Sequence, residues 1–215
     1  MSGIVVHGIP GSPYVRSALL GFEEKGVPYR LAVMPMGAAR TPEYLKRQPF
    51  GRIPSMEHGD FSLYETQAIL RYADSLSPRN PLQPQEAKAA ARMNQIVGIV
   101  DWYVFPQITV KITAERLMSQ MFWGRGPDEE GVAKALPAAS VCVQELERLI
   151  GSAPFLAGDC ISIADLMLAP HIAMFRMTAE GQGLLRGTHL NEWMDRMAAR
   201  PSLQATERER LMQAA

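Results

Sequence analysis

Three prolines occur within the seven residues 78–84, and the character of the chain changes on either side of them. Before this segment, short β-branched and aromatic runs alternate with helical patterns. After it the strand signals stop and only long helical patterns follow. Prolines at this density interrupt regular structure and are typical of linkers. We therefore expect a mixed α/β domain over 1–77, a linker over 78–85 and an all-helical domain over 86–215.

The first domain has the predicted order β-α-β-α-β-β-α. Residues 4–6 are a compact β-branched run that favours a buried strand, and 13–25 carry apolar side chains at helical spacing with Gly26 as a C-cap. A second strand is expected at 29–33, which makes the first pair of strands parallel. The remaining elements are expected as a helix at 42–47, a hairpin that turns at 58–60, and a helix at 66–76.

Beyond the linker, the apolar spacing predicts helices over 85–105, 108–122, 129–150, 163–177 and 190–199. Pro106 and Pro137 are expected to interrupt or kink this helical structure, since proline lacks the N–H that a helix interior needs. Ser162 and Asp165 have the spacing of a capping box at the start of a helix, so we assign them a structural role.

Composition excludes several classes of function. The 22 basic and 22 acidic side chains give a formal net charge of zero, and nucleic-acid binding needs a basic excess or stripe. Cys142 and Cys160 are too few for a disulfide framework and lack metal-ligand spacing, so no metal is expected. Neither a signal peptide nor a membrane-spanning run is found. We expect a cytoplasmic protein without nucleic-acid or membrane partners.

Ser12 lies in the first strand-to-helix loop, directly before Pro13. A helix N-terminus carries unsatisfied N–H groups and partial positive charge, which attract anions. Serine is also a common N-cap, and this structural interpretation is the more general one. The residues alone leave both roles open.

Two further loops follow the same logic. At Ile53–Pro54 a cis peptide bond would expose the Ile53 backbone to an extended ligand, although residue statistics alone favour trans. Glu65 and Thr66 stand where a strand becomes a helix, and they could hold an amino-acid head group or simply be a solvated acid and a cap. All three loops fall at one edge of the predicted sheet, which favours a shared binding site.

Aromatic and methionine residues cluster in the helical part, at 102–105 and 118–123. Such stretches usually belong to the core, but they also suit pockets for apolar ligands. Trp102, Phe105 and Phe122 are our candidates for such a pocket, together with Tyr14 beside the serine loop.

The motifs taken together resemble the serine-type glutathione transferases, of the phi, tau or theta kind. The resemblance rests on GIPGSPYVR at 8–16, FEEKGVPY at 22–29, PEYL at 42–45, PFGRIP at 49–54, YETQAI at 64–69 and FLAGD at 155–159. It covers the first domain densely and the helical domain sparsely. It implies a thioredoxin-like domain that binds glutathione, a helical domain with a hydrophobic substrate site, and a homodimer.

The resemblance also implies roles for single residues. Ser12 would stabilise the glutathione thiolate, and the Ile53 backbone would pair with the cysteinyl unit, with Pro54 cis. Glu65 and Thr66 would bind the γ-glutamyl group. Arg40 stands where relatives often carry a lysine for the glycyl carboxylate, and Arg52 belongs to the same set of glutathione-binding residues.

Departures from the family pattern bear on these roles. Ala39 replaces a frequent histidine, so binding of the glycyl carboxylate is expected to be weaker or rearranged, and Gln48 replaces a common asparagine. No cysteine lies near Ser12, which argues against the cysteine-type classes and their thiol-transfer chemistry. His7 stands roughly where tyrosine-type classes carry their catalytic tyrosine, which disfavours that class.

The function implied is conjugation of glutathione, as co-substrate and without a bound cofactor, to hydrophobic electrophiles. Alternatives on the same fold are a glutathione-dependent isomerase, dehalogenase or peroxidase, and a non-catalytic binding module.

Overall fold

The computed structural model describes residues 3–213, which form two compact units. The first unit combines the described residues up to 83 with those from 199 onward, and the second spans 84–198. The sequence predicts all of 86–215 as one helical domain, whereas the structure packs 199–213 with the first unit. The reason is hydrophobic burial, because Leu211 joins the core of that unit and is 7 % exposed.

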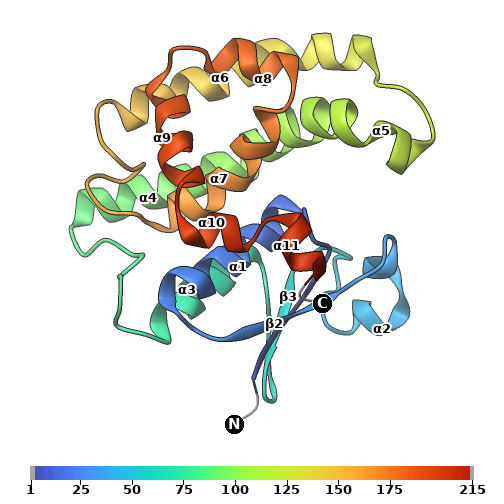
Figure 1. Ribbon diagram of the computed structural model, residues 1–215, viewed down its shortest axis with the longest axis vertical. Helices are drawn as coiled ribbons and strands as arrows, with labels where there is room; N and C mark the ends of the chain where they lie inside the picture. Colours follow the sequence, from blue (N-terminus) through green and yellow to red (C-terminus); the bar gives the residue numbers. More distant parts are fainter. Residues whose placement is uncertain (1–2, 214–215) are drawn as a thin grey trace. The chain divides into compact units, whose positions relative to one another are not determined.

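The first unit is built on a four-stranded sheet with the order β2-β1-β3-β4. β1 and β2 are parallel, whereas β1–β3 and β3–β4 are antiparallel. Its elements are β1 (Ile4–Gly8), α1 (Pro13–Lys25), β2 (Tyr29–Val33), a 3₁₀ turn (Ala38–Arg40), α2 (Pro42–Leu45), β3 (Ser55–His58), β4 (Phe61–Tyr64), α3 (Thr66–Ser75), α10 (Pro201–Ala205) and α11 (Arg208–Gln213). The β-α-β-α-β-β-α order predicted for the first domain is confirmed (Figure 1).

One face of the sheet is covered by α1 and α3. Strand alternation turns Ile4, Val6 and Met56 to this face, where they meet the apolar stripes of the two helices. The buried members from the helices are Val15, Ala18, Leu19, Phe22, Ile69 and Ala73. The first helix ends at Gly26, whose φ of 61° is the left-handed conformation that glycine adopts without a Cβ penalty.

The C-terminal segment 199–213 is fixed along α1 by buried polar contacts. Glu24 accepts two hydrogen bonds from the Arg200 guanidinium, at 2.8 and 2.7 Å, and another from the Ser202 hydroxyl. Nearer the start of α1, Arg16 donates to the Leu203 carbonyl at 2.7 Å. These contacts anchor the segment at both ends of the helix.

In the described part of the second unit, every named element is a helix, and one isolated β-bridge joins Phe155 and Gly158 in a loop. Its elements are α4 (Ala87–Ile99), a π-helix (Val100–Ala114), α5 (Glu115–Trp123), α6 (Glu129–Ile150), α7 (Ile163–Phe175), α8 (Ala179–Leu185) and α9 (His189–Ala198). No helix in the described part of the chain is long and apolar enough to cross a membrane.

The predicted gap between two helices at 106–107 is not observed, although a π-helical segment interrupts the α-helical pattern around Pro106. The chain continues from α4 through the π-helix into α5, with Pro106 inside the π-helical segment. The i→i+5 pattern widens each turn, which gives the pyrrolidine ring the room that an α-helical turn denies it. Pro137 likewise lies inside the continuous helix α6.

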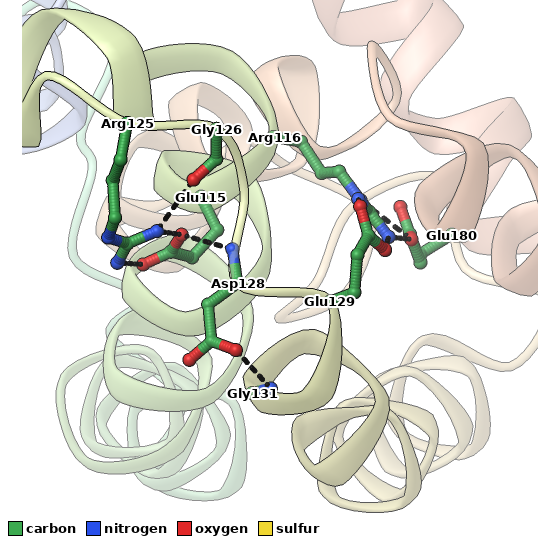
Figure 2. A network of polar contacts seen from close by, with 8 residues as sticks. All are labelled: Glu115, Arg116, Arg125, Gly126, Asp128, Glu129, Gly131 and Glu180. Atoms are coloured by element: carbon green, nitrogen blue, oxygen red, sulfur yellow. Dashed lines mark hydrogen bonds and ion pairs between the residues drawn. The ribbon is translucent and has the colours of Figure 1, made fainter.

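Arginine–glutamate pairs fix the turn between α5 and α6. Arg116 binds both oxygens of Glu129, at 2.6 and 2.9 Å, and also reaches Glu180 on α8 (Figure 2). Arg125 binds Glu115 through two further contacts of 2.9 Å. Because paired guanidinium and carboxylate groups match in geometry, this network holds three helices of the unit together.

The predicted capping box at the start of α7 is confirmed. Asp165 is fully buried and accepts from the Ser162 N–H at 2.8 Å. The same carboxylate accepts from the Trp193 indole at 2.8 Å and from the Leu156 N–H at 2.9 Å. The loop at Leu156, the start of α7 and α9 therefore meet at one satisfied acceptor, which supports the structural role given to Ser162 and Asp165.

Candidate functional site

The predicted loops meet at one edge of the sheet. In the antiparallel register His7 lies opposite Ser55, and Ser55 lies opposite Tyr64. The end of β1, the start of β3 and the end of β4 are therefore neighbours. The loops that carry Ser12, Pro54 and Glu65 leave the sheet at these three points, as the sequence predicts.

The Ser12 hydroxyl is not used to cap α1. Ser12 occupies the N-cap position with an extended backbone, and its carbonyl accepts from the Arg16 N–H at 2.9 Å. Its side chain makes no capping hydrogen bond. The sequence left a cap and an anion-binding role open, and the observed geometry leaves this half-buried hydroxyl available to a ligand.

The second loop ends in a cis Ile53–Pro54 bond, which confirms the expectation from the family resemblance. Pro54 is buried, and Ile53 packs against the core of the first unit. Gly51 precedes these residues with a φ of 64°, and a Cβ there would lie 3.3 Å from the Ala39 carbonyl oxygen. A side chain at this position would be strained by the backbone conformation and crowded by that carbonyl.

Glu65 has an unusual backbone conformation. Its φ of 69° and ψ of 116° lie in a region that non-glycine residues rarely occupy. Its carbonyl accepts from the Ala68 and Ile69 N–H groups, at 2.9 and 3.0 Å, while its exposed carboxylate makes no cap bond. Strained backbone persists where the surroundings impose it, often at ligand-binding sites.

Thr66 is the first residue of α3 and not its cap, which corrects the simpler structural interpretation. The N-cap is Glu65, and the buried Thr66 hydroxyl lies 3.4 Å from the Tyr14 carbonyl, a long contact. The contact joins the start of α3 to the first turn of α1. The first and third loops of the site are thus connected through Tyr14.

Both positively and negatively charged side chains lie at this edge of the sheet. Arg40 ends the 3₁₀ turn, and its side chain lies beside Gly51, within 3.8 Å of a Cβ built there. Arg52 is exposed in the cis-proline loop, and Glu65 supplies a carboxylate. An extended ligand with both carboxylate and ammonium groups would find complementary charges here.

The aromatic candidates for a hydrophobic pocket are only partly covered. Trp102 is 77 % exposed and Phe122 is 38 % exposed, so neither is a core residue of the second unit. Phe105 stands edge-on to His171 with ring centres 6.3 Å apart. Tyr14 belongs to the first unit and is half-buried. Their contact with a substrate stays a prediction.

Two supports of the site were not predicted from the sequence. Tyr44 and Gln48 bind the backbone of Arg52 through buried side chains. The C-terminal segment also reaches the serine loop, because a Cβ on Gly11 would lie 3.2 Å from Arg208 Cδ. For the first support, the sequence offered only the family match at 42–45 and the departure from the family pattern at Gln48. For the second support it offered no signal.

Family models match both parts of the chain. Residues 6–81 match the glutathione S-transferase N-terminal domain, and 130–196 match the glutathione S-transferase C-terminal domain. Glutathione S-transferase 4 of Zea mays is 31 % identical over 208 residues, covering 93 % of this chain and 89 % of the relative. A rice protein, probable glutathione S-transferase GSTF2, is 27 % identical and covers 95 % of each chain.

Solved structures share the whole architecture. Poplar glutathione transferase F1 matches over 100 % of both chains with a TM-score of 0.86 and 26 % identity. The class of cytosolic glutathione transferases is defined by a thioredoxin-like α/β unit, whose loops form the glutathione site, followed by a helical unit. This class agrees with the resemblance found in the sequence. The chain belongs to the glutathione S-transferase family.

Proposed function

We propose that this protein is a glutathione transferase that joins the glutathione thiolate to hydrophobic electrophiles. The observation that supports this most directly is the edge of the sheet where Ser12, the cis-proline loop and Glu65 meet. An extended tripeptide with three charged groups fits a site with backbone, cationic and anionic partners. A related structure from maize contains an atrazine glutathione conjugate, a product of this type of reaction.

Each end of glutathione has a complementary partner in the proposal. Glu65 would bind the γ-glutamyl ammonium, and the N-terminus of α3 at Thr66 would attract the adjacent carboxylate. The backbone of Ile53 before Pro54 would pair with the cysteinyl unit. Arg40 and Arg52 would attract the glycyl carboxylate, although Ala39 supplies no side chain for it.

Ser12 would act on the reacting sulfur. A free thiol has a pKa of about 8.5, so only a small fraction is thiolate at neutral pH. A hydrogen bond from the Ser12 hydroxyl and the partial charge at the start of α1 both favour the anion. The thiolate sulfur then attacks the electrophilic carbon, a carbon–sulfur bond forms, and the leaving group departs with its electron pair.

Tyr14, Trp102, Phe105 and Phe122 would contact the apolar electrophile. Aromatic side chains supply large apolar contact surfaces, and ligand pockets are lined mainly by such residues, so an apolar electrophile is expected. Glutathione is the only co-substrate in this proposal, and no bound cofactor is required. We further propose that the protein is cytoplasmic and forms a homodimer.

The proposal is tested by retention on immobilised glutathione followed by conjugation of chlorodinitrobenzene. We expect elution by free glutathione, and conjugate absorbance that requires glutathione and increases faster with the enzyme than without it. Retention without conjugation, but with glutathione-dependent peroxide reduction, would replace the proposal with a peroxidase. Failure to bind glutathione at all would reject it.

A further inference from the structure

Both backbone polar groups of Arg52 are bound by buried side chains. The Tyr44 hydroxyl donates to the Arg52 carbonyl at 2.8 Å, and the Arg52 N–H donates to Gln48 Oε1 at 3.1 Å. Tyr44 is 4 % exposed and Gln48 is 1 % exposed. Both distances are within the range of well-formed hydrogen bonds.

These two side chains are themselves held in place. The Tyr44 carbonyl accepts from the Arg47 and Gln48 N–H groups, at 2.8 and 3.0 Å, and the Gln48 carbonyl accepts from Gly51 at 3.1 Å. Burial raises the pKa of Tyr44, so the phenol stays protonated and remains a donor. The turn that carries them is therefore a rigid support for the cis-proline loop.

Because the peptide group is planar, the contacts that fix the Arg52 carbonyl also fix the direction of the Ile53 N–H. The Arg52 carbonyl and the Ile53 N–H belong to the same planar unit, which is trans, because Ile53–Pro54 is the only cis bond among the described residues. The carbonyl and N–H of a trans peptide point in opposite directions. When Tyr44 binds the carbonyl from the buried side, the Ile53 N–H points the other way. It forms no hydrogen bond within the described part of the chain.

We propose that Tyr44 and Gln48 are positioning residues that aim the Ile53 amide at the cysteinyl backbone of glutathione. This inference rests on the proposed function, because it assigns the ligand of that amide. The two residues touch the protein backbone and not the substrate. Their contribution is to fix the peptide plane before the ligand arrives, which lowers the ordering cost of binding.

The effect is expected on affinity more than on chemistry. The backbone contact holds glutathione equally in the ground state and the transition state, so its loss raises the KM for glutathione with little change in kcat. Tyr44→Phe removes the hydroxyl and keeps the ring. We expect glutathione to bind about threefold to tenfold more weakly in calorimetric titration, the effect of losing one buried hydrogen bond.

A matched control is Tyr72→Phe in the same unit. The Tyr72 hydroxyl bonds His58 Nδ1 at 2.7 Å, away from the cis-proline loop. This variant also loses one tyrosine hydrogen bond, but its glutathione affinity should equal that of the wild type. Turnover of chlorodinitrobenzene at saturating glutathione should stay within about twofold of the wild-type rate in both variants.

Gln48→Met is the second variant, because methionine has a similar length and lacks the acceptor for the Arg52 N–H. We expect the same loss of affinity, together with faster hydrogen exchange at the Arg52 amide, a readout independent of glutathione. Unchanged affinity and exchange in Tyr44→Phe and Gln48→Met would overturn the proposal, and so would equal losses in Tyr72→Phe. Absence of glutathione binding by the wild type would instead reject the proposed function and this inference with it.

Discussion

At the scale of single residues, the site depends on polar side chains that stand at helix N-cap positions but do not cap the helix. The Ser12 hydroxyl stands at the N-cap of α1 without capping it, and the Glu65 carboxylate does the same at the start of α3. Glu65 also holds a backbone conformation that costs an ordinary residue about 1–3 kcal/mol. Stability and binding therefore make opposite demands at this position.

Glu65→Gly separates these demands. Glycine accepts the φ of 69° without strain, so we expect stability to rise by about 1 kcal/mol while glutathione binding weakens. Glu65→Ala keeps most of the strain and should lose affinity without gaining stability. Chemical denaturation and calorimetric titration of both variants check this. Undiminished affinity in the two variants would show that Glu65 is only a surface carboxylate.

Residue types explain which parts of the site could be predicted. Ser12 and Pro54 stand in loops, and Thr66 begins α3, all next to elements whose hydrophobic periodicity is clear. The order of these elements therefore predicts the edge of the sheet at which the three residues lie. The conformation of Glu65 could not be predicted, because glutamate has no preference for positive φ. The contacts of Tyr44 and Gln48 depend on the tertiary path of the chain, which local spacing does not specify.

At the scale of elements, the long helix at 129–150 and the short helix α2 were predicted, whereas three other short helices were missed. Residues 129–150 match α6 from end to end. In contrast, α8, α10 and α11 have seven, five and six residues, too few for a helical period to stand out. The last two matter here, because they form the segment that packs along α1.

The contact between Glu24 and this segment should depend on pH. Burial raises the pKa of Glu24, but the bonds from Arg200 and Ser202 outweigh it, so the pKa lies below its ordinary value. A depressed carboxyl pKa contributes stability above the unfolded-state pKa of about 4.3, and this is lost as pH falls through the folded-state pKa. Glu24→Gln should therefore destabilise the protein by about 2 kcal/mol at neutral pH, and the difference from wild type should shrink below about pH 4.

Denaturation across this pH range provides the measurement, with Glu130→Gln as the control. The ion pair of Glu130 with Lys134 is highly exposed, so its loss should change stability very little. A difference between Glu24→Gln and the wild type that stays constant from neutral to acid pH would contradict the account.

At the scale of the whole molecule, the packing of a single chain gives no reason for the exposure of one aromatic residue. Phe50 is 68 % exposed in the loop before the cis-proline, with its ring edge-on to Tyr64. A large apolar side chain in such a loop favours insertion into a partner. We expect sedimentation at about twice the chain mass of 23.8 kDa.

Phe50→Ala should weaken this dimer by at least about tenfold, the effect of removing a central aromatic anchor. Phe61→Ala is the control, since Phe61 is also an exposed aromatic of the first unit, at 45 % exposure, but lies outside the loop. A wild-type protein that sediments only as a monomer at micromolar concentration would reject the dimer. Equal weakening by both variants would reject the role of Phe50.

The central claim is that the Ser12 loop stabilises a glutathione thiolate, and the titration of bound glutathione tests it most directly. Ultraviolet difference absorbance reports the thiolate as pH rises. In the wild type we expect an apparent pKa at least about one unit below the 8.5 of a free thiol, and in folded Ser12→Ala a return towards the free value. The same variant should lose turnover at neutral pH and regain part of it at higher pH. Bound glutathione that titrates like free glutathione, in a wild-type protein that binds it, would contradict the account.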